Sequence, residues 1–373
     1  MTSTVHLADL RASIRQSIPD KIAALLAAAG LPDALRGGGN VAIKLHFGER
    51  GNTAFIRPVL VRRVVQEVRA LGGRPFLTDT CTLYRGSRET APAHLETAIQ
   101  NGFAYAVVDA PLIVADGVRG VTGKKVRVDL PRKRSVAIAS AILDADALVV
   151  LSHFKCHELT GFGGALKNLG MGCATREGKL DQHSGIGPKI QAAKCVKCGN
   201  CVQACSFKAI SLGEKSAEID EKKCVGCGEC IVVCPEQAIG VRWVAKAHEA
   251  AEKMVEYAFG ALAGKRDRAL FLNFVTQVSP ACDCYGHADA PIVPDLGIAA
   301  SRDPVALDAA CADLVNAAPG LPGTALAKAH KPGADKFRDV YPAIDWTVQL
   351  AHAEKIGLGS RKYELARLET RFT

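Results

Sequence analysis

This sequence of 373 residues lacks the features that point to membranes, export or nucleic acid. No apolar run approaches the ~20 residues that a helix needs to cross a bilayer. The start, MTSTVHLADLRASIRQSIPDK, has no apolar stretch between a basic flank and a small-residue cleavage site, so we expect no secretory signal. Aromatic residues make up only 5%, and no stripe interleaves them with basic residues as nucleic-acid binding would require. We therefore expect neither a membrane nor a nucleic acid as partner.

Fingerprints of organic cofactors are missing too. The glycine-rich stretch GFGGALKNLGMG lacks the G-K-[ST] of a Walker loop, and its glycines do not fit the G-x-G-x-x-G pattern of dinucleotide sites. No flavin or nicotinamide fingerprint occurs elsewhere in the chain. The sequence thus neither indicates nor excludes an organic cofactor.

Cysteine, by contrast, is abundant, with 14 residues. In a large chain without an export signal this number favours metal ligation in a reducing compartment over disulfides, so we expect a cytoplasmic protein. Hydrophobic residues make up 48% and charged residues 23%, which suffices to bury a sizeable core. The formal charge of +9 lies mostly outside residues 190–243. It favours anionic ligands or an acidic partner, unless it is spread over solvated side chains.

Eight cysteines fall in two stretches that repeat each other, KCVKCGNCVQACSFKAISL from Lys194 and KCVGCGECIVVCPEQAIGV from Lys223. Each has the spacing C-x2-C-x2-C-x3-C, and the pair resembles a bacterial two-cluster ferredoxin, in which the fourth cysteine of each run binds the other cluster. The resemblance implies two 4Fe–4S clusters, one held by Cys195, Cys198, Cys201 and Cys234 and the other by Cys224, Cys227, Cys230 and Cys205. The second run ends in Cys-Pro as in that family, whereas the first has Ser206 after its last cysteine, which leaves the ligands intact.

The rest of the chain has the pattern of an α/β fold. Strand-like runs occur at Asn40–Leu45, Arg74–Asp79, Asp146–Ser152 and Ala269–Val275. Helical patterns occur at Arg57–Leu71, Pro92–Asn101, Lys246–Ala263 and Asp303–Asn316, and the first 35 residues also look helical. This alternation predicts a mostly parallel sheet covered on both faces. Because the cysteine repeats interrupt the pattern, we predict a discontinuous α/β domain of residues 1–189 and 244–373, with an inserted ferredoxin-like α+β domain at 190–243.

A polar stretch follows each of the four predicted strands: HFGERGN, DTCTLYRGSR, HFKCHELTGFGG and SPACDCYGH. Ligands of open α/β sheets bind outside the carboxyl ends of the strands, so we expect these stretches to line one cleft. The candidates for catalysis in it are His46, His153, His157 and Lys167. A histidine near a carboxylate, as His46 is near Glu49, can form an acid–base pair or a metal pair, but it can equally form an ordinary exposed ion pair.

The glycine-rich stretch after the third strand is a candidate for binding an anion. Glycines let backbone N–H groups approach a phosphate or carboxylate, and a following helix start adds partial positive charge. The candidate residues are Gly163, Gly164, Lys167, Asn168 and Arg176. The alternative is that these glycines only allow tight packing turns.

Four cysteines outside the repeats occur near the predicted cleft: Cys156, Cys173, Cys282 and Cys284. Four thiolates, or two thiolates with two histidines, would suit zinc or iron, so a third metal or cluster site is one interpretation. The thiols could instead be redox or substrate-binding groups. They could also be buried and inert, which is a common fate of free cysteine.

Several longer motifs together resemble the family named domain of unknown function 362 (DUF362), in the form with a two-cluster ferredoxin insert. These motifs are KLHFGERGN, SHFKCH with GFGGALKNLGMGCATREGK, ACDC, and VPDLGIAASRDPVALDAACADLV. The resemblance runs from about Asn40 to about Asn316 and implies a bacterial or archaeal iron–sulfur protein without a settled reaction. A more distant likeness to the nickel-pincer lactate racemase architecture matches no motif position by position, so no residue role is taken from it.

Three hypotheses for the function follow. The first is an oxidoreductase whose two clusters pass low-potential electrons from a redox partner protein to the cleft, where a small anionic substrate is reduced. The second is an electron-transfer module without catalysis that docks to a larger redox enzyme. The third is a factor that handles metals or clusters. We favour the first, because it explains why electron-carrying cysteines and a polar cleft share one chain.

Overall fold

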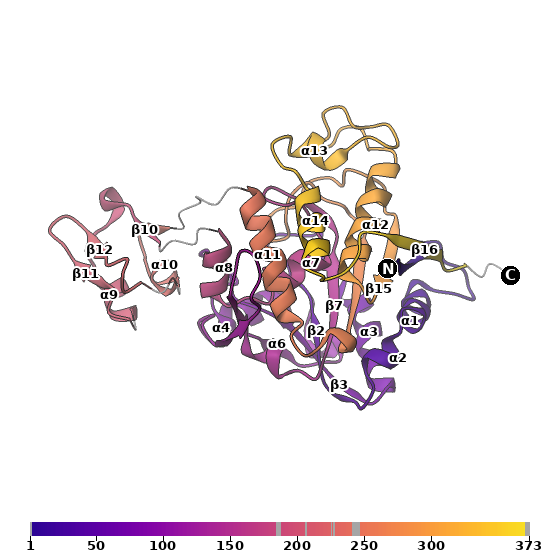
Figure 1. The fold of residues 1–373 in the computed structure, drawn as a ribbon, viewed down its shortest axis with the longest axis horizontal. Coiled ribbons are helices and arrows are strands. Elements are labelled where there is room, and N and C mark those ends of the chain that lie inside the picture. The colour runs from indigo at the N-terminus through magenta and orange to yellow at the C-terminus, as the bar shows by residue number, and fades with distance from the viewer. Residues whose placement is uncertain are drawn as a thin grey trace.

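A computed structural model describes residues 2–183, 188–205, 207–224, 226, 228–240 and 247–369. Its centre is an eight-stranded sheet with the order β16-β1-β15-β14-β7-β2-β3-β4 (Figure 1). In that order the strands are Tyr363–Arg367, Ser3–Ala8, Gly297–Ser301, Ala269–Val275, Ala147–His153, Gly39–Lys44, Gly73–Asp79 and Leu112–Val114. All neighbouring strands are parallel except that β15 runs antiparallel to both of its neighbours. The sheet is therefore mostly parallel, as predicted.

Helices cover both faces of the sheet, because its central strands are apolar on both sides. Along β7, Leu148 and Val150 pack into one hydrophobic core, whereas Val149 and Leu151 pack into the other. The second core also takes in the buried face of α3, whose valines recur at helical spacing. The helices on that side are α1 (Ile18–Ala28), α2 (Leu31–Ala34), α3 (Pro58–Ala70), α4 (Ala91–Gln100) and α5 (Tyr105–Val108). Those on the first core are α6 (Ser140–Asp144), α7 (Ala165–Gly170), α11 (Ala247–Ala261), α12 (Pro304–Ala317), α13 (Lys336–Val340) and α14 (Thr347–Lys355).

The four predicted strands correspond to β2, β3, β7 and β14, and the four predicted helices to α3, α4, α11 and α12. The prediction that the first 35 residues are helical is wrong in part, since Ser3–Ala8 forms the strand β1 ahead of α1. This strand pairs with β15 and β16, which come from the other end of the chain. Its structure therefore depends on partners about 290 to 360 residues away, which local patterns do not reveal.

Smaller elements complete the α/β part. Two hairpins, β5–β6 (Gly123–Arg127 and Ser135–Ala139) and β8–β9 (Lys155–His157 and Gly161–Gly163), lie outside the main sheet. The helix α8 (Arg176–His183) leads toward the cysteine repeats. No helix among the described residues is both long and apolar enough to cross a membrane.

Residues 188–240 contain the cysteine repeats and build two small antiparallel sheets of their own, β10–β13 and β11–β12. Their elements are β10 (Lys189–Ile190), a 3-10 turn at Ala192–Lys194, α9 (Asn200–Ala204), β11 (Ile210–Leu212), β12 (Ala217–Ile219), α10 (Glu229–Val232) and β13 (Ile239–Gly240). In Figure 1 this segment projects from the layered body on the side of α8. We call it the cysteine segment. Its described residues add no strand to the eight-stranded sheet.

Candidate functional site

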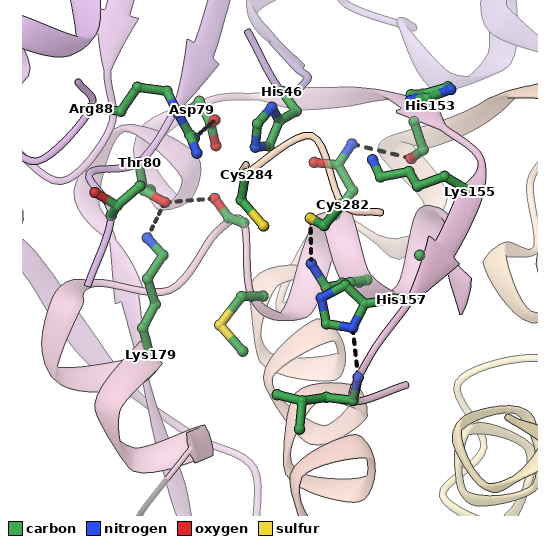
Figure 2. Close-up of a pocket in the computed structure, with 18 of the residues that line it drawn as sticks. His46, Asp79, Thr80, Arg88, His153, Lys155, His157, Lys179, Cys282 and Cys284 are labelled. Atoms are coloured by element: carbon green, nitrogen blue, oxygen red, sulfur yellow. Dashed lines mark hydrogen bonds and ion pairs between the residues drawn. The ribbon is translucent and has the colours of Figure 1, made fainter. Parts of the chain in front are cut away.

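A pocket of about 390 Å³ opens at the carboxyl ends of β2, β3 and β7 and is closed by the loop that follows β14 (Figure 2). The strands β14, β7, β2 and β3 are adjacent and parallel, so the segments after them emerge at the same edge of the sheet. Each of the four predicted polar stretches contributes side chains to the lining, among them His46, Thr80, His157 and Cys282. The volume is in the range of small-molecule sites.

Positive charge dominates this pocket. Five lysine and arginine side chains line it but only two carboxylates do: Lys44, Arg88, Lys155, Lys167 and Lys179 against Asp79 and Glu158. A pocket with such an excess of buried cations attracts anions, because ammonium and guanidinium groups lose their hydration when buried and gain from an opposite charge.

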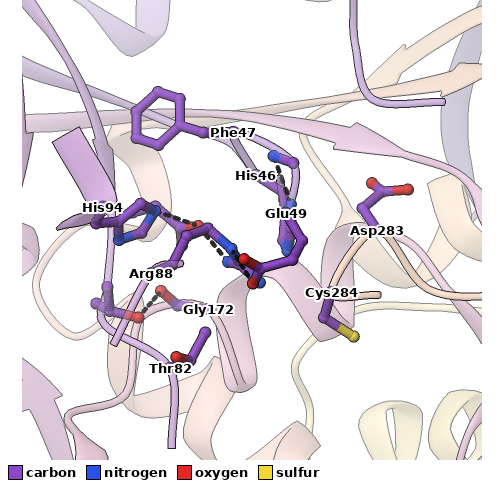
Figure 3. A network of polar contacts seen from close by, with 12 residues as sticks. His46, Phe47, Glu49, Thr82, Arg88, His94, Gly172, Asp283 and Cys284 are labelled. Atoms are coloured by element: carbon purple, nitrogen blue, oxygen red, sulfur yellow. Dashed lines mark hydrogen bonds and ion pairs between the residues drawn. The ribbon is translucent and has the colours of Figure 1, made fainter. Parts of the chain in front are cut away.

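Some of these cations are already neutralised within the protein. Lys44 Nζ lies 2.9 Å from Asp79 Oδ1 and donates to Asn168 Oδ1 at 2.6 Å. Arg88 Nε lies 3.1 Å from Glu49 Oε2, and its Nη1 lies 3.7 Å from Asp79 Oδ2 (Figure 3). Burial alone would raise the pKa of Asp79, but Lys44 and the neighbouring histidines and arginine hold that pKa well below its usual range. Asp79 is therefore a carboxylate that fixes two cations in the wall.

Lys179 differs from these, because in the described part of the chain its ammonium donates hydrogen bonds only to neutral oxygens. Its Nζ contacts the Thr80 hydroxyl, the Cys81 carbonyl oxygen at 2.6 Å and the Ala174 carbonyl oxygen at 3.1 Å. The side chain is buried, and burial lowers the pKa of Lys179. An anion in the pocket would provide the opposite charge that these oxygens do not.

Asp283 stands between the two pocket cysteines in sequence and anchors their loop. Its Oδ1 lies 2.8 Å from His153 Nδ1, and its Oδ2 accepts from Lys155 Nζ at 2.8 Å. Burial would raise the pKa of Asp283, but His153 and Lys155 hold it well below its usual range. The other ring nitrogen of His153 lies 2.9 Å from the Thr276 carbonyl oxygen. Both nitrogens of His153 are thus bound within the protein, which makes it a positioning residue for the loop.

His46 and His157 have defined tautomers. Nδ1 of His46 accepts the Gly48 N–H at 2.9 Å, and Nδ1 of His157 accepts the Leu159 N–H at 3.1 Å. In the neutral rings the proton therefore sits on Nε2. Burial, with a further contribution from Arg88, lowers the pKa of His46 well below its usual value, so this ring is neutral at pH 7. Both residues line the pocket and can donate a hydrogen bond there.

Cys282 and Cys284 both line the pocket, and Figure 2 shows their side chains between His46 and His157. Lys167 Nζ lies 3.6 Å from Cys282 Sγ. A hydrogen bond from the Cys284 thiol outweighs burial and, together with Lys167 and His157, lowers the pKa of Cys282 well below its usual value. Burial would lower the pKa of Lys167, but the Cys282 sulfur raises it. The arrangement favours a thiolate at Cys282 beside a charged Lys167.

The glycine-rich stretch forms the turn before α7, but the first amides of this helix are already occupied. The N–H groups of Ala165 and Leu166 donate to the two carboxylate oxygens of Asp308 on α12, at 2.7 and 2.9 Å. Gly164 is needed for this approach, because a Cβ there would lie 2.3 Å from Asp308 Oδ1. The anion at this helix start is thus Asp308 itself. Gly163, Gly164, Lys167 and Asn168 still line the pocket.

The remaining candidates lie elsewhere. Arg176 is fully buried outside the pocket lining and donates to the carbonyl oxygens of Thr82, Arg119 and Glu89. Cys156 and Cys173 belong to a hydrophobic core, where burial raises the pKa of both thiols, that of Cys173 to about 11. The structure therefore brings only two of the four extra cysteines into the pocket.

Sequence reasoning missed several residues of the site, namely Arg88, Lys155, Asp283 and Asp308. Lys155 could have been found, because it alternates with His153 and His157 as side chains on one face of an extended chain do. Asp283 lies between two cysteines, and its partners His153 and Lys155 are about 130 positions away in the sequence. Arg88 and Asp308 carry no local signal, since their partners lie 39 and 143 positions away.

Two small hollows occur in the cysteine segment, and cysteines line both. Cys195, Cys198, Cys201 and Cys234 surround one of them, and Cys205, Cys224 and Cys230 surround the other. Cys227 lies outside the described residues. Backbone N–H groups donate to three of the sulfurs: Ala217 N to Cys195 Sγ at 3.4 Å, Ala209 N to Cys205 Sγ at 3.3 Å, and Ala238 N to Cys234 Sγ at 3.2 Å.

Among the described residues, no three or more His, Cys, Asp or Glu side chains converge on the position of a single metal ion. This does not conflict with the cysteine hollows, because each thiolate of a 4Fe–4S cluster binds a different iron and the four sulfurs need not meet at one point. The donor set, four thiolates around a hollow with N–H groups directed at sulfur, fits such a cluster.

The cysteine segment contacts the loop that lines the pocket. Leu83 takes part in the pocket lining and also in the hydrophobic cluster that contains Cys201, Cys230 and Cys234. Arg85 Nη1 donates to the Cys234 carbonyl oxygen at 3.0 Å. Gly228, with φ near 71°, lets the backbone approach closely: a Cβ there would lie 3.1 Å from Leu83 Cδ1. Arg119 adds an ion pair with Glu229 at 2.6 Å.

The comparisons with known proteins give a family but no activity. The family model described as "Domain of unknown function (DUF362)" matches residues 41–313. No curated protein matches the sequence. Among solved structures, the chain is similar to the lactate racemase apoprotein from Thermoanaerobacterium thermosaccharolyticum, with 16% identity and a TM-score of 0.40. That match covers 74% of this chain and 51% of the other, so the chain spans about half the length of that protein.

Proposed function

Since the chain belongs to the DUF362 family, whose description gives no reaction, we propose its function from its own residues. The protein is an iron–sulfur oxidoreductase. Its cysteine segment would hold two 4Fe–4S clusters, whose chemistry when bound is the transfer of single electrons from a redox partner protein, and its pocket would bind the small anionic substrate that is reduced.

One observation carries this proposal: Leu83 is shared between the pocket and the hydrophobic cluster around the cysteines. A carrier that only docked to another enzyme would have no reason to pack its cysteines against the wall of a cationic pocket. Arg85 and Gly228 strengthen the same contact. Gly226 and Gly228, which line the hollow with Cys205, Cys224 and Cys230, also approach side chains of the α/β part, Leu180 and Leu83.

The cysteines would hold the clusters as the ferredoxin spacing implies, Cys195, Cys198, Cys201 and Cys234 on one and Cys224, Cys227, Cys230 and Cys205 on the other. When bound, clusters of this kind supply single electrons at low potential. The N–H groups directed at the sulfurs of Cys195, Cys205 and Cys234 would stabilise the negative charge of such clusters.

The residues of the pocket would bind and orient the substrate. Lys179 and Lys167 supply positive charge that no carboxylate of the lining neutralises directly, so they are the groups expected to hold the anion. His46 and His157 each present an Nε2–H toward the pocket and can donate a hydrogen bond to the bound molecule. The apolar side chains Leu83, Leu151 and Leu159 limit access of water.

The first test is iron and acid-labile sulfide per chain in protein purified without oxygen. We expect about eight of each, and loss of about four when Cys198→Ser removes one ligand. Cys311→Ser, in the core and outside the ferredoxin spacing, is the matched control and should keep the full content. Protein with intact fold but no iron would overturn the proposal.

The second test addresses the pocket. Malonate, a small dicarboxylate, should bind to the wild type, and Lys179→Met or Lys167→Met should weaken its binding by roughly tenfold or more, because a charge-assisted contact is lost. Lys124→Met, at an exposed position, should leave the dissociation constant unchanged. Isothermal titration calorimetry measures all four proteins. Equal affinities would show that the pocket is not an anion site.

A further inference from the structure

We propose that Cys282 and Cys284 are a redox-active dithiol that reduces small disulfides carrying carboxylates. This inference rests on the proposed function for the supply of electrons, and it names the substrate class of the same pocket.

The loop directs both thiols to the same side. In a regular strand, two residues separated by one position point to the same side of the strand. The chain is not extended here but makes a turn, in which Tyr285 N donates to the Cys282 carbonyl oxygen at 3.1 Å. The intervening Asp283 is fully buried and is held by His153 and Lys155. Cys282 and Cys284 both line the pocket from this turn, two positions apart in the chain. Two cysteines so close in the chain can form a disulfide when their side chains lie on the same side.

The two sulfurs have different surroundings, which suits a nucleophile and a resolving thiol. Cys282 Sγ has Lys167 Nζ at 3.6 Å, and this ammonium favours a thiolate there. The pKa of Cys284 is raised by its interaction with the Cys282 side chain, by burial and by the charge of the Cys282 thiolate. Cys284 therefore keeps its proton. Cys282 is the expected attacking group and Cys284 the expected resolving group.

The pair is separated from the other free cysteines. Cys156 and Cys173 lie in the hydrophobic core outside the pocket lining, so four thiols do not come together in the part of the chain that the structure describes. Thiol chemistry of the pair alone therefore accounts for the geometry better than a third metal site does.

The reaction would proceed by thiol–disulfide exchange. The Cys282 thiolate attacks one sulfur of the substrate RSSR, forming a mixed disulfide and releasing RS⁻. Cys284 then attacks the Cys282 sulfur, which releases the second half as RS⁻, and the Cys284 proton goes to that leaving group. The products are RS⁻, RSH and a Cys282–Cys284 disulfide. Two electrons, delivered singly through the cysteine segment from the redox partner, and one proton restore the thiolate–thiol pair.

The charge of the pocket selects the substrate. Lys179 on one wall and Lys167 beside the thiolate favour carboxylates, and the volume of about 390 Å³ favours a small molecule over a protein disulfide. The test compounds are 3,3′-dithiodipropionate, which carries two carboxylates, and 3,3′-dithiodipropionamide, which is neutral and of similar size.

Mass spectrometry can follow the two thiols directly. Trypsin releases residues 269–302 as one peptide, and Cys282 and Cys284 are its only cysteines. After reaction of the anaerobic protein with 3,3′-dithiodipropionate, this peptide should take up no alkylating reagent and be two hydrogens lighter. Reduction with dithiothreitol should restore two alkylation sites. A peptide that keeps both free thiols under these conditions would overturn the inference.

A trapped intermediate distinguishes the roles of the two cysteines. In Cys284→Ser, Cys282 should accumulate the mixed disulfide with 3,3′-dithiodipropionate at least tenfold faster than with the neutral disulfide. In Cys282→Ser, Cys284 should react slowly with both. Equal rates for the two variants, or for the two compounds, would contradict the assignment. Cys173→Ser is the matched control and should behave like the wild type.

The iron content of the same samples separates this inference from the proposed function. If the variants keep their iron and the pocket binds malonate but no disulfide forms, the dithiol inference fails and the proposed function stands. If the protein holds no iron, the proposed function fails, whereas the alkylation pattern still reports on the dithiol. Loss of iron or zinc on Cys282→Ser would instead identify a metal site and refute the dithiol.

Discussion

At the scale of single residues, several buried charges of this protein are bound by neutral backbone oxygens. Arg176 is 0% exposed, and its guanidinium donates hydrogen bonds to the carbonyl oxygens of Thr82, Glu89 and Arg119. Thr82 lines the pocket, and Arg119 forms an ion pair with Glu229 of the cysteine segment. Arg176 therefore organises the wall without facing the pocket.

Replacing Arg176 should destabilise the protein strongly. In Arg176→Gln most of the hydrogen bonds from this fully buried side chain to the three carbonyl oxygens are lost, so we expect the free energy of unfolding to fall by about 3 kcal/mol. Arg127→Gln, at an exposed position, should change it by less than about 0.5 kcal/mol. Urea denaturation followed by circular dichroism measures both. A small effect of Arg176→Gln would mean that water replaces the guanidinium at these carbonyls.

His94 should make the stability depend on pH. The ring is 0% exposed, neither nitrogen has a hydrogen-bond partner among the described residues, and burial lowers the pKa of His94 to about 3 despite the nearby Asp79. The unfolded chain binds this proton near pH 6.5, so stability is complete above that pH and is lost as the pH falls toward 3. Between pH 6.5 and 5, the titration of His94 should lower the free energy of unfolding by about 2 kcal/mol.

The measurement compares unfolding free energies at pH 6.5 and 5. The difference should shrink by roughly 2 kcal/mol in His94→Gln and stay unchanged in His287→Gln, which alters an exposed histidine. His183, whose pKa burial also lowers to about 3, contributes its own share to the wild-type difference. An unaltered difference in His94→Gln would show that this ring is protonated in the folded protein.

At the scale of elements, the sequence predicts those strands and helices whose signal is local. The apolar runs that became β2, β7 and β14 are buried on both faces, and the valines of α3 recur at helical spacing. The strands β1 and β16 have no such signal, because they are short and half exposed and are held by each other across the whole chain. Long-range pairing of this kind cannot be read from a local pattern.

The same limit applies to the site. Strand ends and polar stretches predicted where the pocket lies and named His46, His157 and Lys167 among its residues. The ion pairs Arg88–Glu49 and Lys155–Asp283 could not be predicted, because the two residues of each pair meet only in the folded protein. The glycine-rich loop was ambiguous for a physical reason: a helix start accepts any carboxylate, and here α12 provides Asp308.

Asp308 joins three elements, so its replacement should affect both stability and the pocket. Its carboxylate accepts from Ala165 N, Leu166 N and Asn273 Nδ2, the last at 2.7 Å. Asp308→Ala should lower the free energy of unfolding by about 3 kcal/mol, because three buried donors lose their acceptor.

The shift of α7 that follows should also weaken malonate binding through Lys167 and Asn168. Asp313→Ala on the same helix removes an exposed carboxylate that accepts from Tyr363, and it should cost less than about 1 kcal/mol. Thermal denaturation measures the stability of Asp308→Ala and Asp313→Ala, and isothermal titration calorimetry measures their affinity for malonate. Equal stability of the two variants would show that the amides at the start of α7 find other partners.

At the scale of the whole molecule, the α/β part and the cysteine segment differ strongly in the size of their hydrophobic cores. The eight-stranded sheet has a large hydrophobic core on each face. The cysteine segment has one small cluster, in which three of the ten buried residues are cysteines and two others, Leu83 and Leu180, come from the α/β part. So small a core cannot stabilise the segment by burial alone.

Removing iron should therefore unfold the cysteine segment selectively. Treatment with an oxidant and a chelator should increase amide hydrogen exchange across residues 188–240 by at least tenfold, because cluster binding supplies folding free energy. Exchange in β7 and β14 should change little, and these strands serve as the internal control. Unchanged exchange in the segment would mean that its fold does not depend on metal.

The excess of buried cations in the pocket has a practical consequence for anyone handling the protein. Phosphate, citrate, acetate and similar buffer ions carry the charge that Lys167 and Lys179 attract, and at millimolar concentrations they would compete with a weakly bound substrate. Screens for the natural substrate in such buffers would return false negatives. Amine buffers with chloride as counterion leave these lysines available for the compound that is being screened.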